Sequence, residues 1–310
     1  MISIAVPIYN EEKNIHEFYK RLNSVMEDIQ NLYEIIFVDD GSSDASFEII
    51  SEICAVDKKV KIIQLSRNFG HQIALTAGID YACGDAVIMM DADLQHPPEL
   101  IPELIKKWKE GYDIVYTIRE ESKDYRWFKK FTSRFFYTLL NKVSKIDIPE
   151  GVADFRLLSR PVVESLKNFK ERNRFIRGLI SWIGYKKIAI PYIAEKRFAG
   201  KSKYSFDKML RFAISGITSF SSVPLYISVI LGFIIAGFSF ACALQAIYAK
   251  FFTNKTVPGW TSILVSVLFL GGIQLIAIGI LGEYLAKVYD EVKQRPLYIV
   301  ERTKGFNEKE

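Results

Sequence analysis

Two clusters of acidic side chains follow hydrophobic runs in the first third of the sequence. One run continues into Asp39-Asp40-Gly41-Ser42-Ser43-Asp44, and the other continues into Asp91-Ala92-Asp93-Leu94-Gln95. Carboxylate oxygens are the ligands that Mg²⁺ and Mn²⁺ prefer, and such ions usually bind through a few carboxylates together with substrate phosphates. The second cluster therefore predicts a divalent cation held by Asp91 and Asp93. Turn formation also favours Asp, Gly and Ser, so for either cluster alone a purely structural role stays open.

Short β-rich runs alternate with helical stretches around these clusters. Strands are predicted at residues 2–8, 34–38, 60–65, 86–90 and 113–116. Between the first two, apolar residues at positions 15, 18, 22, 25 and 29 mark one face of a helix. Pro97 and Pro98 suit the start of another helix. Such alternation predicts an α/β domain with a mostly parallel sheet and helices on both faces. Ligands of such sheets bind at the carboxyl ends of the strands, where the two acidic clusters lie.

Other nucleotide-binding signatures are absent from the sequence. No G-x-G-x-x-G follows the first predicted strand, and Gly200-Lys201-Ser202 has Glu195 where a P-loop needs its first glycine. A dinucleotide enzyme and a P-loop NTPase are therefore disfavoured. The three cysteines contain no C-x-x-C pair, which argues against a zinc site or a disulfide framework and fits a reducing compartment. The N-terminus resembles no signal peptide, so we expect the catalytic part not to be exported.

Two long segments near the C-terminus carry no charge at all. Residues 212–249 and 256–282 contain neither acidic nor basic side chains. Spanning the hydrocarbon core takes about 20 apolar residues. We therefore predict transmembrane helices at Leu225–Tyr248 and Thr261–Gly282, joined by a short loop around residues 254–259. A pair of buried core helices is the alternative.

Lysine and arginine counts predict the orientation of this hairpin. The flank 196–211 carries six, the flank 287–304 carries five, and the segment between the two predicted helices carries two, Lys250 and Lys255. Because basic flanks stay in the cytoplasm, we expect a multi-pass protein of the cell (inner or plasma) membrane with its catalytic domain and both termini cytoplasmic.

The charge of the chain is unevenly distributed. Residues 1–116 hold 20 acids and 10 bases, whereas residues 117–211 hold 10 acids and 23 bases. Within the basic part, Ser122–Lys145 interleaves cations with apolar residues near helical spacing, which predicts an amphipathic helix at the membrane interface. A solvated basic helix is the alternative. Tyr204–Ser222 predicts a second helix leading into the first span. Nucleic acid is disfavoured as a partner because RNA-binding motifs are missing.

Several motifs together resemble glycosyltransferase family 2. They are VPIYNEE (6–12), VDDGSSD (38–44), LSRNFG (65–70), DADLQHPPE (91–99) and RFAGKSKYSF (197–206). More closely they are similar to its polyprenyl-phosphate branch, which includes bactoprenol glucosyltransferases and dolichol-phosphate mannose synthases. DFRLLSR (154–160) and residues 266–300 are similar to the bactoprenol enzymes in particular. The likeness covers nearly the whole chain.

The resemblance implies a GT-A fold and inverting transfer of a sugar from a nucleotide sugar to a lipid phosphate. It assigns the nucleotide sugar to Pro7, Tyr9, Glu11, Asp40 and Asp91, and the Mg²⁺ or Mn²⁺ ion to Asp91, Asp93 and Gln95. It assigns catalytic positions to Asp93, Asp154, Arg197 and Lys203. Arg119 and Arg134 are our candidates for binding the lipid phosphate. A lipid phosphate is largely ionised at neutral pH, so it needs a strong general base less than a sugar hydroxyl does.

The resemblance also implies the partners and the domain plan. We expect UDP-glucose as donor, undecaprenyl phosphate as acceptor, the lipid bilayer, and a homo-oligomer for which a tetramer and a dimer are both open. The expected domains are residues 1–120 (nucleotide-sugar core), 121–222 (acceptor face), 223–284 (two spans) and 285–310 (cytoplasmic tail).

The sequence departs from the family pattern at two places, and rival functions stay open. His96 stands where relatives usually carry aspartate, and His71-Gln72 stands where close relatives often carry Lys-Glu; His96 is also open to interpretation as a surface substitution. N-acetylglucosamine, galactose or a modified arabinose are alternative sugars. A processive polysaccharide synthase is disfavoured because Lys123 replaces the glutamine of its Q-x-x-R-W motif and because only two spans are present. A non-catalytic membrane scaffold is disfavoured by the intact carboxylates.

Overall fold

A computed structural model describes residues 1–29, 32–120, 149, 151–172, 174–193, 218, 221–248, 252 and 259–306. The chain divides into two compact units. A globular unit comprises Met1–Arg211 together with Arg295–Glu310, and a helical unit comprises Phe212–Gln294. The predicted interfacial helices at Ser122–Lys145 and Tyr204–Ser222 lie wholly or almost wholly outside the described residues.

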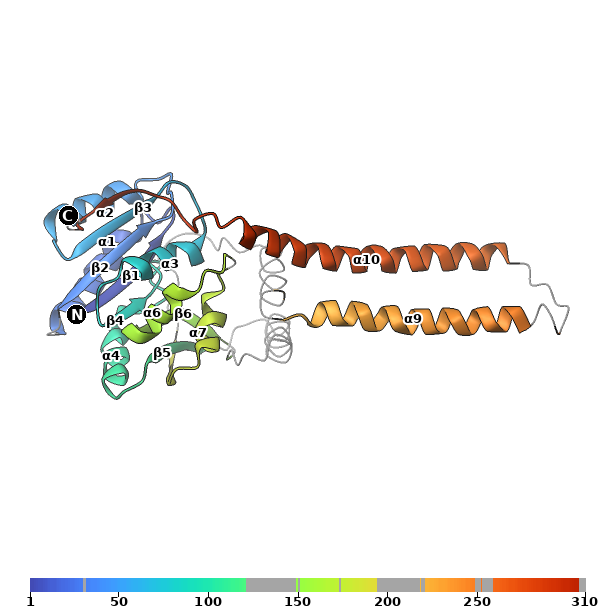
Figure 1. The fold of residues 1–310 in the computed structure, drawn as a ribbon. Helices are drawn as coiled ribbons and strands as arrows, with labels where there is room; N and C mark the ends of the chain where they lie inside the picture. The colour runs from blue at the N-terminus through green and yellow to red at the C-terminus, as the bar shows by residue number, and fades with distance from the viewer. Residues whose placement is uncertain are drawn as a thin grey trace. The chain divides into compact units, whose positions relative to one another are not determined.

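The globular unit is built on one sheet of eight strands in the order β7-β5-β6-β4-β1-β2-β3-β8 (Figure 1). β1 pairs in parallel with β2 and β4, β2 with β3, and β5 with β7, whereas β6 and β8 pair antiparallel with their neighbours. Six strands therefore run in one direction and two in the other. The strands are β1 (Ile2–Ile8), β2 (Tyr33–Asp39), β3 (Val60–Leu65), β4 (Ala86–Met89), β5 (Ile114–Glu120), β6 (Val152–Ser159), β7 (Lys187–Ile193) and β8 (Val300–Lys304).

Helices cover both faces of this sheet. α1 (Ile15–Asp28), α2 (Ser46–Val56) and α4 (Ile101–Lys109), which follows a short 3₁₀ turn (Pro98–Leu100), contribute side chains to one apolar cluster with the even-numbered residues of β1. α3 (His71–Tyr81) lies on the opposite face, where Gly78 approaches Ala5 so closely that a β-carbon would meet it at 2.8 Å. α6 (Arg160–Asn168) and α7 (Ile176–Ile183) complete the described helices of this unit.

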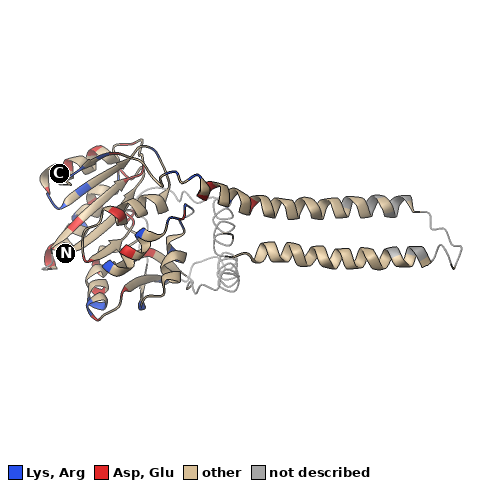
Figure 2. Ribbon diagram, in the orientation of Figure 1, with Lys and Arg blue, Asp and Glu red and all other residues tan. Residues whose placement is uncertain are grey.

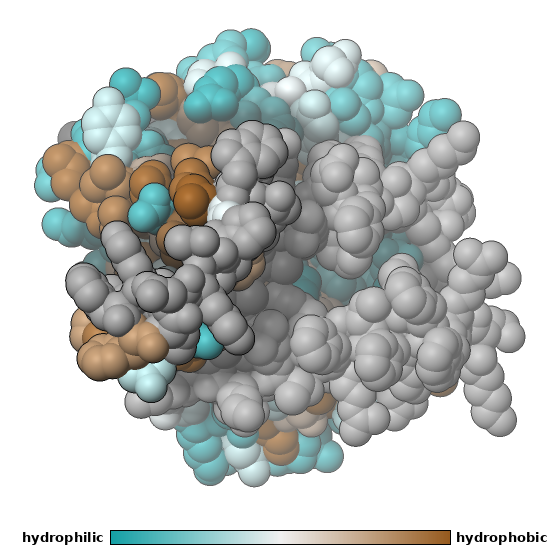
Figure 3. All heavy atoms as spheres, turned by 90° about the vertical axis from the view of Figure 1, so that its right-hand side faces the viewer, coloured by the Kyte–Doolittle hydropathy of each residue, from teal (hydrophilic) through white to brown (hydrophobic). Residues whose placement is uncertain are grey.

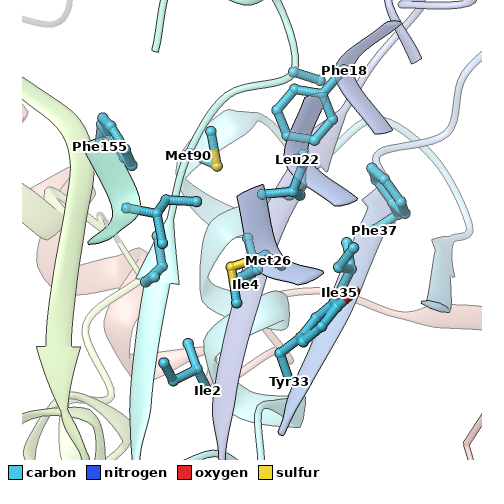
Figure 4. Close-up of a cluster of buried hydrophobic side chains, with 14 of the residues drawn as sticks. Ile2, Ile4, Phe18, Leu22, Met26, Tyr33, Ile35, Phe37, Met90 and Phe155 are labelled. Carbon is cyan, nitrogen blue, oxygen red and sulfur yellow. The ribbon is translucent and has the colours of Figure 1, made fainter. Parts of the chain in front are cut away.

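The main core lies between α1 and the centre of the sheet. Phe18, Leu22 and Met26 share one face of α1 and are fully buried against β1 and β2 (Figure 4). Phe18 and Leu22 belong to the predicted face, whereas Met26 does not, and the predicted Val25 and Ile29 are only partly buried. The rings of Phe18 and Phe37 meet edge to face with centroids 6.2 Å apart. This packing holds β1 and β2 in fixed positions relative to α1.

The five predicted strands are present, with bounds that differ by up to four residues. The prediction of a mostly parallel sheet with helices on both faces is confirmed in outline, but the sheet is mixed because β6 and β8 run against the others. The sequence pattern did not indicate these two strands or β7. β6 is buried at every position although it carries Asp154 and Arg156, so its sequence shows neither an apolar run like that of β1 nor the alternation of a half-exposed strand.

The C-terminal segment returns to the sheet as its edge strand. β8 pairs antiparallel with β3, and the Ser66 amide donates to the Ile299 carbonyl oxygen at 3.0 Å. The Tyr298 hydroxyl donates to the Asp80 carboxylate of α3 at 2.9 Å. Phe306 meets the ring of Tyr81 edge to face. These contacts attach the last described residues to both β3 and α3.

The helical unit contains two long apolar helices, α9 (Val223–Tyr248) and α10 (Trp260–Val292). Their described large side chains are mostly exposed, including Phe233 and Phe238 of α9 and Phe269 of α10, and hydrophobic side chains are visible at the surface in Figure 3. Within the two described helices, charged residues occur only in the last part of α10 (Figure 2). Both helices are long and apolar enough to cross a membrane. α10 extends ten residues beyond the predicted end at Gly282, because no helix-breaking residue precedes Pro296.

We expect Leu22→Ala to destabilise the globular unit by about 2–5 kcal/mol, because it leaves a cavity under α1 at a fully buried position. Leu32→Ala, at a residue that is 80% exposed, is the matched control and should change stability little. Thermal unfolding of both variants in detergent checks this. Equal melting temperatures for the two variants would contradict the assigned core.

Candidate functional site

The carboxyl ends of six strands meet at one edge of the sheet. The loops after β1, β2, β3 and β4 leave from this edge, and so do the ends of β5 and β7. Because β6 runs in the opposite direction, it presents its first residues there instead. The two acidic clusters, Asp154 of β6 and Arg119 of β5 are therefore placed at the same edge.

The loops after β1 and β2 are held together by hydrogen bonds. The Asn10 amide donates to Ser42 Oγ at 3.0 Å, and the Ser43 amide donates to Asn10 Oδ1 at 2.8 Å. The Glu11 amide donates to Ser46 Oγ at 2.9 Å. Asn10 adopts a φ of +53°, which an asparagine tolerates better than most residues. These bonds make the two loops one structure.

Asp40 attaches a third loop to this structure. Its two carboxylate oxygens accept the backbone amides of Phe69 and Gly70, at 2.7 and 2.9 Å. Gly41 has a φ of +68°, and a β-carbon there would lie 2.6 Å from the backbone of Arg67. Burial outweighs these hydrogen bonds and raises the pKa of Asp40. Asp40 thus anchors residues 66–70. Its predicted contact with the nucleotide would use the remaining lone pairs of the same two carboxylate oxygens.

Asp91 lies between two histidines. His71, the first residue of α3, places Nε2 at 2.6 Å from Asp91 Oδ1. His96 Nδ1 accepts the Asp91 backbone amide at 3.1 Å and lies 3.7 Å from Asp91 Oδ2. Burial opposes the charge of His71, but the Asp91 carboxylate outweighs it and raises the pKa of His71 to about 9. In turn, His71 keeps the pKa of Asp91 below its usual value despite burial.

His96 is a buried residue and not a surface substitution. It is 6% exposed, and its ring stacks on Phe155 with centroids 5.4 Å apart. Because its Nδ1 accepts a backbone amide, His96 fixes the turn that carries Asp91 and Asp93. The aromatic stacking explains why an imidazole is stable at this position.

Asp93 is more covered than the sequence suggested. It is 7% exposed, whereas the Asp91 side chain is 30% exposed. Asp93 Oδ1 accepts the Gln95 amide at 3.0 Å, and Leu94 between them has a φ of +61°. The carboxylates of Asp91 and Asp93 also contribute, after burial, to raising the pKa of Tyr192 to about 12. The ring of Tyr192 lies edge to face with that of His96, centroids 6.2 Å apart, on the side of the sheet where His96 contacts Asp91.

Asp154 forms a two-point ion pair with Arg177 of α7. Arg177 donates from Nε and Nη2 to the two Asp154 oxygens at 2.7 and 2.8 Å, and Arg156 Nη2 lies 3.3 Å from Oδ1. Burial would raise the pKa of Asp154, but the two guanidinium groups dominate and hold it well below its usual range. Asp154 is therefore a carboxylate at neutral pH and a poor proton acceptor. The sequence contained no signal for Arg177, because nothing in its spacing relates it to Asp154.

Of the remaining predicted site residues, some belong to the described part of the chain and others lie outside it. Pro7 is buried at the end of β1, Tyr9 is 38% exposed, and Glu11 accepts the side-chain amide of Asn14. Arg119 is half-buried near the end of β5, opposite Tyr192 of β7 in the register. Arg134, Arg197 and Lys203 lie outside the described residues. The structure thus places Pro7, Tyr9, Glu11, Asp40, Asp91, Asp93, Gln95, Arg119 and Asp154 on loops or strand ends of this edge.

The donor set at this edge fits a divalent cation that is shared with a phosphate ligand. Among the described residues, no group of three or more His, Cys, Asp or Glu side chains could enclose a metal ion. Mg²⁺ commonly binds through one or two carboxylates and completes its shell with substrate phosphates and water. Asp91 and Asp93 supply carboxylates of that kind, and Gln95 supplies an amide oxygen, so these three would hold the ion.

Comparison with known proteins identifies the class. Residues 3–167 match the glycosyl transferase family 2. Over 99% of this chain and 95% of the relative, the sequence is 49% identical to an uncharacterized glycosyltransferase, YkcC, from Bacillus subtilis. The chain belongs to glycosyl transferase family 2 and is a glycosyltransferase with a GT-A-like mixed sheet.

Relatives with a named activity match over the same length. A prophage bactoprenol glucosyl transferase homolog of Escherichia coli is 44% identical over 98% of this chain and 99% of the relative. The bactoprenol glucosyl transferase of Shigella phage SfII is 44% identical over 99% of each chain. The resemblance seen in the motifs therefore extends through the helical unit as well.

We expect Arg177→Gln to destabilise the protein by about 3 kcal/mol at pH 7.5, because it leaves a buried carboxylate short of its main partner. The folded-state pKa of Asp154 is lowered, so the pair stabilises above the ordinary carboxyl pKa of about 4 and its contribution is lost as the pH falls. Thermal unfolding at pH 7.5 and at about pH 3, below that ordinary carboxyl pKa, should show a smaller difference from wild type at the lower pH.

The control for this change is Lys107→Gln, which removes an exposed ion pair with Glu110 and should alter stability little at either pH. A loss of stability in Arg177→Gln that is the same at both pH values would show that the guanidinium acts by packing and not through the Asp154 charge.

Proposed function

We propose that this protein transfers glucose from UDP-glucose to undecaprenyl phosphate and releases a lipid-linked sugar phosphate. The observation that carries the proposal is the 44% identity to bactoprenol glucosyl transferases, which runs through both units of the chain. The residues at the carboxyl ends of the strands support the proposal. Acidic, basic and aromatic side chains lie together there, as binding of a nucleotide diphosphate requires.

The donor would bind over the loops after β1, β2 and β4. Pro7, Tyr9, Glu11 and Asp40 would hold the nucleoside, and Asp91, Asp93 and Gln95 would hold the diphosphate through Mg²⁺ or Mn²⁺. A bound divalent cation supplies charge neutralisation for the departing diphosphate. Arg197 and Lys203 would add a basic clamp on the same charge. Asp91 would be presented to the ligand by His71 and by the turn that His96 fixes.

The acceptor phosphate would attack the anomeric carbon directly and invert it. A phosphate monoester is already ionised near neutral pH. Asp154 is held as an anion by Arg177 and Arg156, so we assign it to orienting the acceptor and not to removing a proton. Arg119 and Arg134 would bind the acceptor phosphate, Arg119 from the end of β5.

The acceptor must reach the protein from a bilayer. We propose that α9 and α10 cross the cell membrane as a hairpin, which their length, apolar composition and exposed side chains support. The basic flanks would keep the globular unit and both termini in the cytoplasm. We further propose a homo-oligomer, with dimer and tetramer both open.

Purified full-length protein in detergent tests the proposed reaction. With Mg²⁺ or Mn²⁺, undecaprenyl phosphate and a panel of labelled nucleotide sugars, we expect a single lipid-linked sugar, formed fastest from UDP-glucose. Preference for UDP-N-acetylglucosamine, UDP-galactose or a modified arabinose donor would change the assigned sugar. A polymeric product would favour a processive synthase, and no turnover with any donor would favour a non-catalytic scaffold.

Asp93→Asn should lower kcat/KM by at least about 100-fold without lowering the melting temperature, because it removes the charge that the cation needs but keeps the acceptor of the Gln95 amide. Asp28→Asn, an exposed change on α1, is the matched control and should turn over like wild type. Near-normal activity of Asp93→Asn would refute its place at the cation.

Protease treatment of sealed inverted membrane vesicles should remove the globular unit, because that unit would then face the outside of the vesicle. An N-terminal epitope should disappear in inverted vesicles and survive in intact spheroplasts. Protection in the inverted vesicles would overturn the proposed orientation, and recovery of the full chain in the soluble fraction would overturn the membrane assignment.

A further inference from the structure

We propose that His71 is a positioning residue for the cation site: it fixes the orientation of the Asp91 carboxylate and thereby raises the affinity for the divalent ion. The inference deepens the proposed function and rests on it, since it concerns the cation that Asp91 would hold. It rests on a contact between the first residue of α3 and the residue that follows the end of β4, which the motifs alone do not show.

The contact is direct and selective for one oxygen. His71 Nε2 lies 2.6 Å from Asp91 Oδ1, whereas Oδ2 lies 3.7 Å from the nearest imidazole nitrogen of His96. A carboxylate that is held through one oxygen cannot rotate freely, so the other oxygen keeps a fixed direction. Carboxylates that ligate metals are commonly held by hydrogen bonds of this kind from an outer group. Asp91 is 30% exposed, so it stays open to a ligand.

The residue after His71 ties the start of α3 to α7. Gln72 Oε1 accepts the Ile176 amide at the start of α7, at 3.2 Å, and Gln72 Nε2 lies 3.3 Å from His71 Nδ1. The next residue of α7 is Arg177, which pairs with Asp154. Residues 71 and 72 therefore join the Asp91 side of the edge to the Asp154 side.

α3 gives this pair a rigid base. Gly78 lies against Ala5 and Val38 of the central strands, where even a β-carbon would be too close to Ala5. Asp80, near the end of the helix, accepts the Tyr298 hydroxyl at 2.9 Å. The Gly70 amide that precedes the helix is bound by Asp40. Because α3 is fixed at both ends and along its face, the position of the His71 ring is set by the fold.

The test measures Mn²⁺ binding to full-length protein in detergent with UDP present, by electron paramagnetic resonance, at one fixed pH. His71→Ala should weaken Mn²⁺ binding on the order of tenfold. His71→Gln, which keeps a side-chain N–H donor, should recover most of the affinity. His16→Ala, at an exposed position of α1, is the matched control and should bind like wild type.

Unchanged or tighter Mn²⁺ binding in His71→Ala would overturn the inference, and so would a loss that His71→Gln fails to recover while its melting temperature equals that of wild type. The outcome is separable from that of the proposed function. If wild type turns over UDP-glucose but His71→Ala binds Mn²⁺ normally, only the inference fails. If wild type turns over no lipid acceptor and the histidine dependence of Mn²⁺ binding remains, only the proposed function fails.

Discussion

The common direction of six strands is the constraint on which the site depends. Parallel pairing of β1, β2, β3 and β4 sends every following loop to one edge, and hydrogen bonds between those loops then close the edge into a continuous surface. β6 enters between β4 and β5 in the opposite direction and brings Asp154 to that surface from the start of a strand. Reversing any one of these strands would carry its functional residue to the far end of the sheet.

Buried charge at this edge is balanced locally. Asp154 has two guanidinium partners, Asp91 has an imidazole beside it, and Asp40 has two backbone amides. The three carboxylates thus have different partners. They also differ in how far their oxygens remain accessible to a ligand. Asp154 is the most strongly neutralised, which favours an orienting role. Asp91 is the most open of the three, which favours contact with the donor.

The sequence predicted the parts of the fold whose pattern is local. The face of α1 and the strands at residues 2–8 and 60–65 followed from the runs and spacing of their apolar residues. β6 and β8 were not predicted: β6 carries Asp154 and Arg156 within a buried strand, and β8 is short, mostly exposed and separated from β3 by more than 200 residues of chain. Whether these two segments form strands depends on the strands with which they pair, and the local sequence does not reveal those strands.

The same limit applies to the site. Asp40, Asp91 and Asp93 could be found because they directly follow hydrophobic runs. The Arg177–Asp154 pair and the His71–Asp91 contact could not be found in this way. Each depends on where the first turn of a helix lies relative to the strand ends in the folded protein. From the sequence His96 is open to interpretation as a surface residue, whereas its burial, its hydrogen bond with the Asp91 amide and its stacking on Phe155 show that it is part of the buried turn.

The return of the chain to the sheet after α10 changes how the two units are connected. Residues 295–310 belong to the globular unit although they follow both long helices. The helical unit is therefore an insertion in the globular unit. Two covalent connections join it to that unit, whereas a C-terminal extension would have one. Cleavage of the chain at either connection would therefore leave the two units covalently joined at the other.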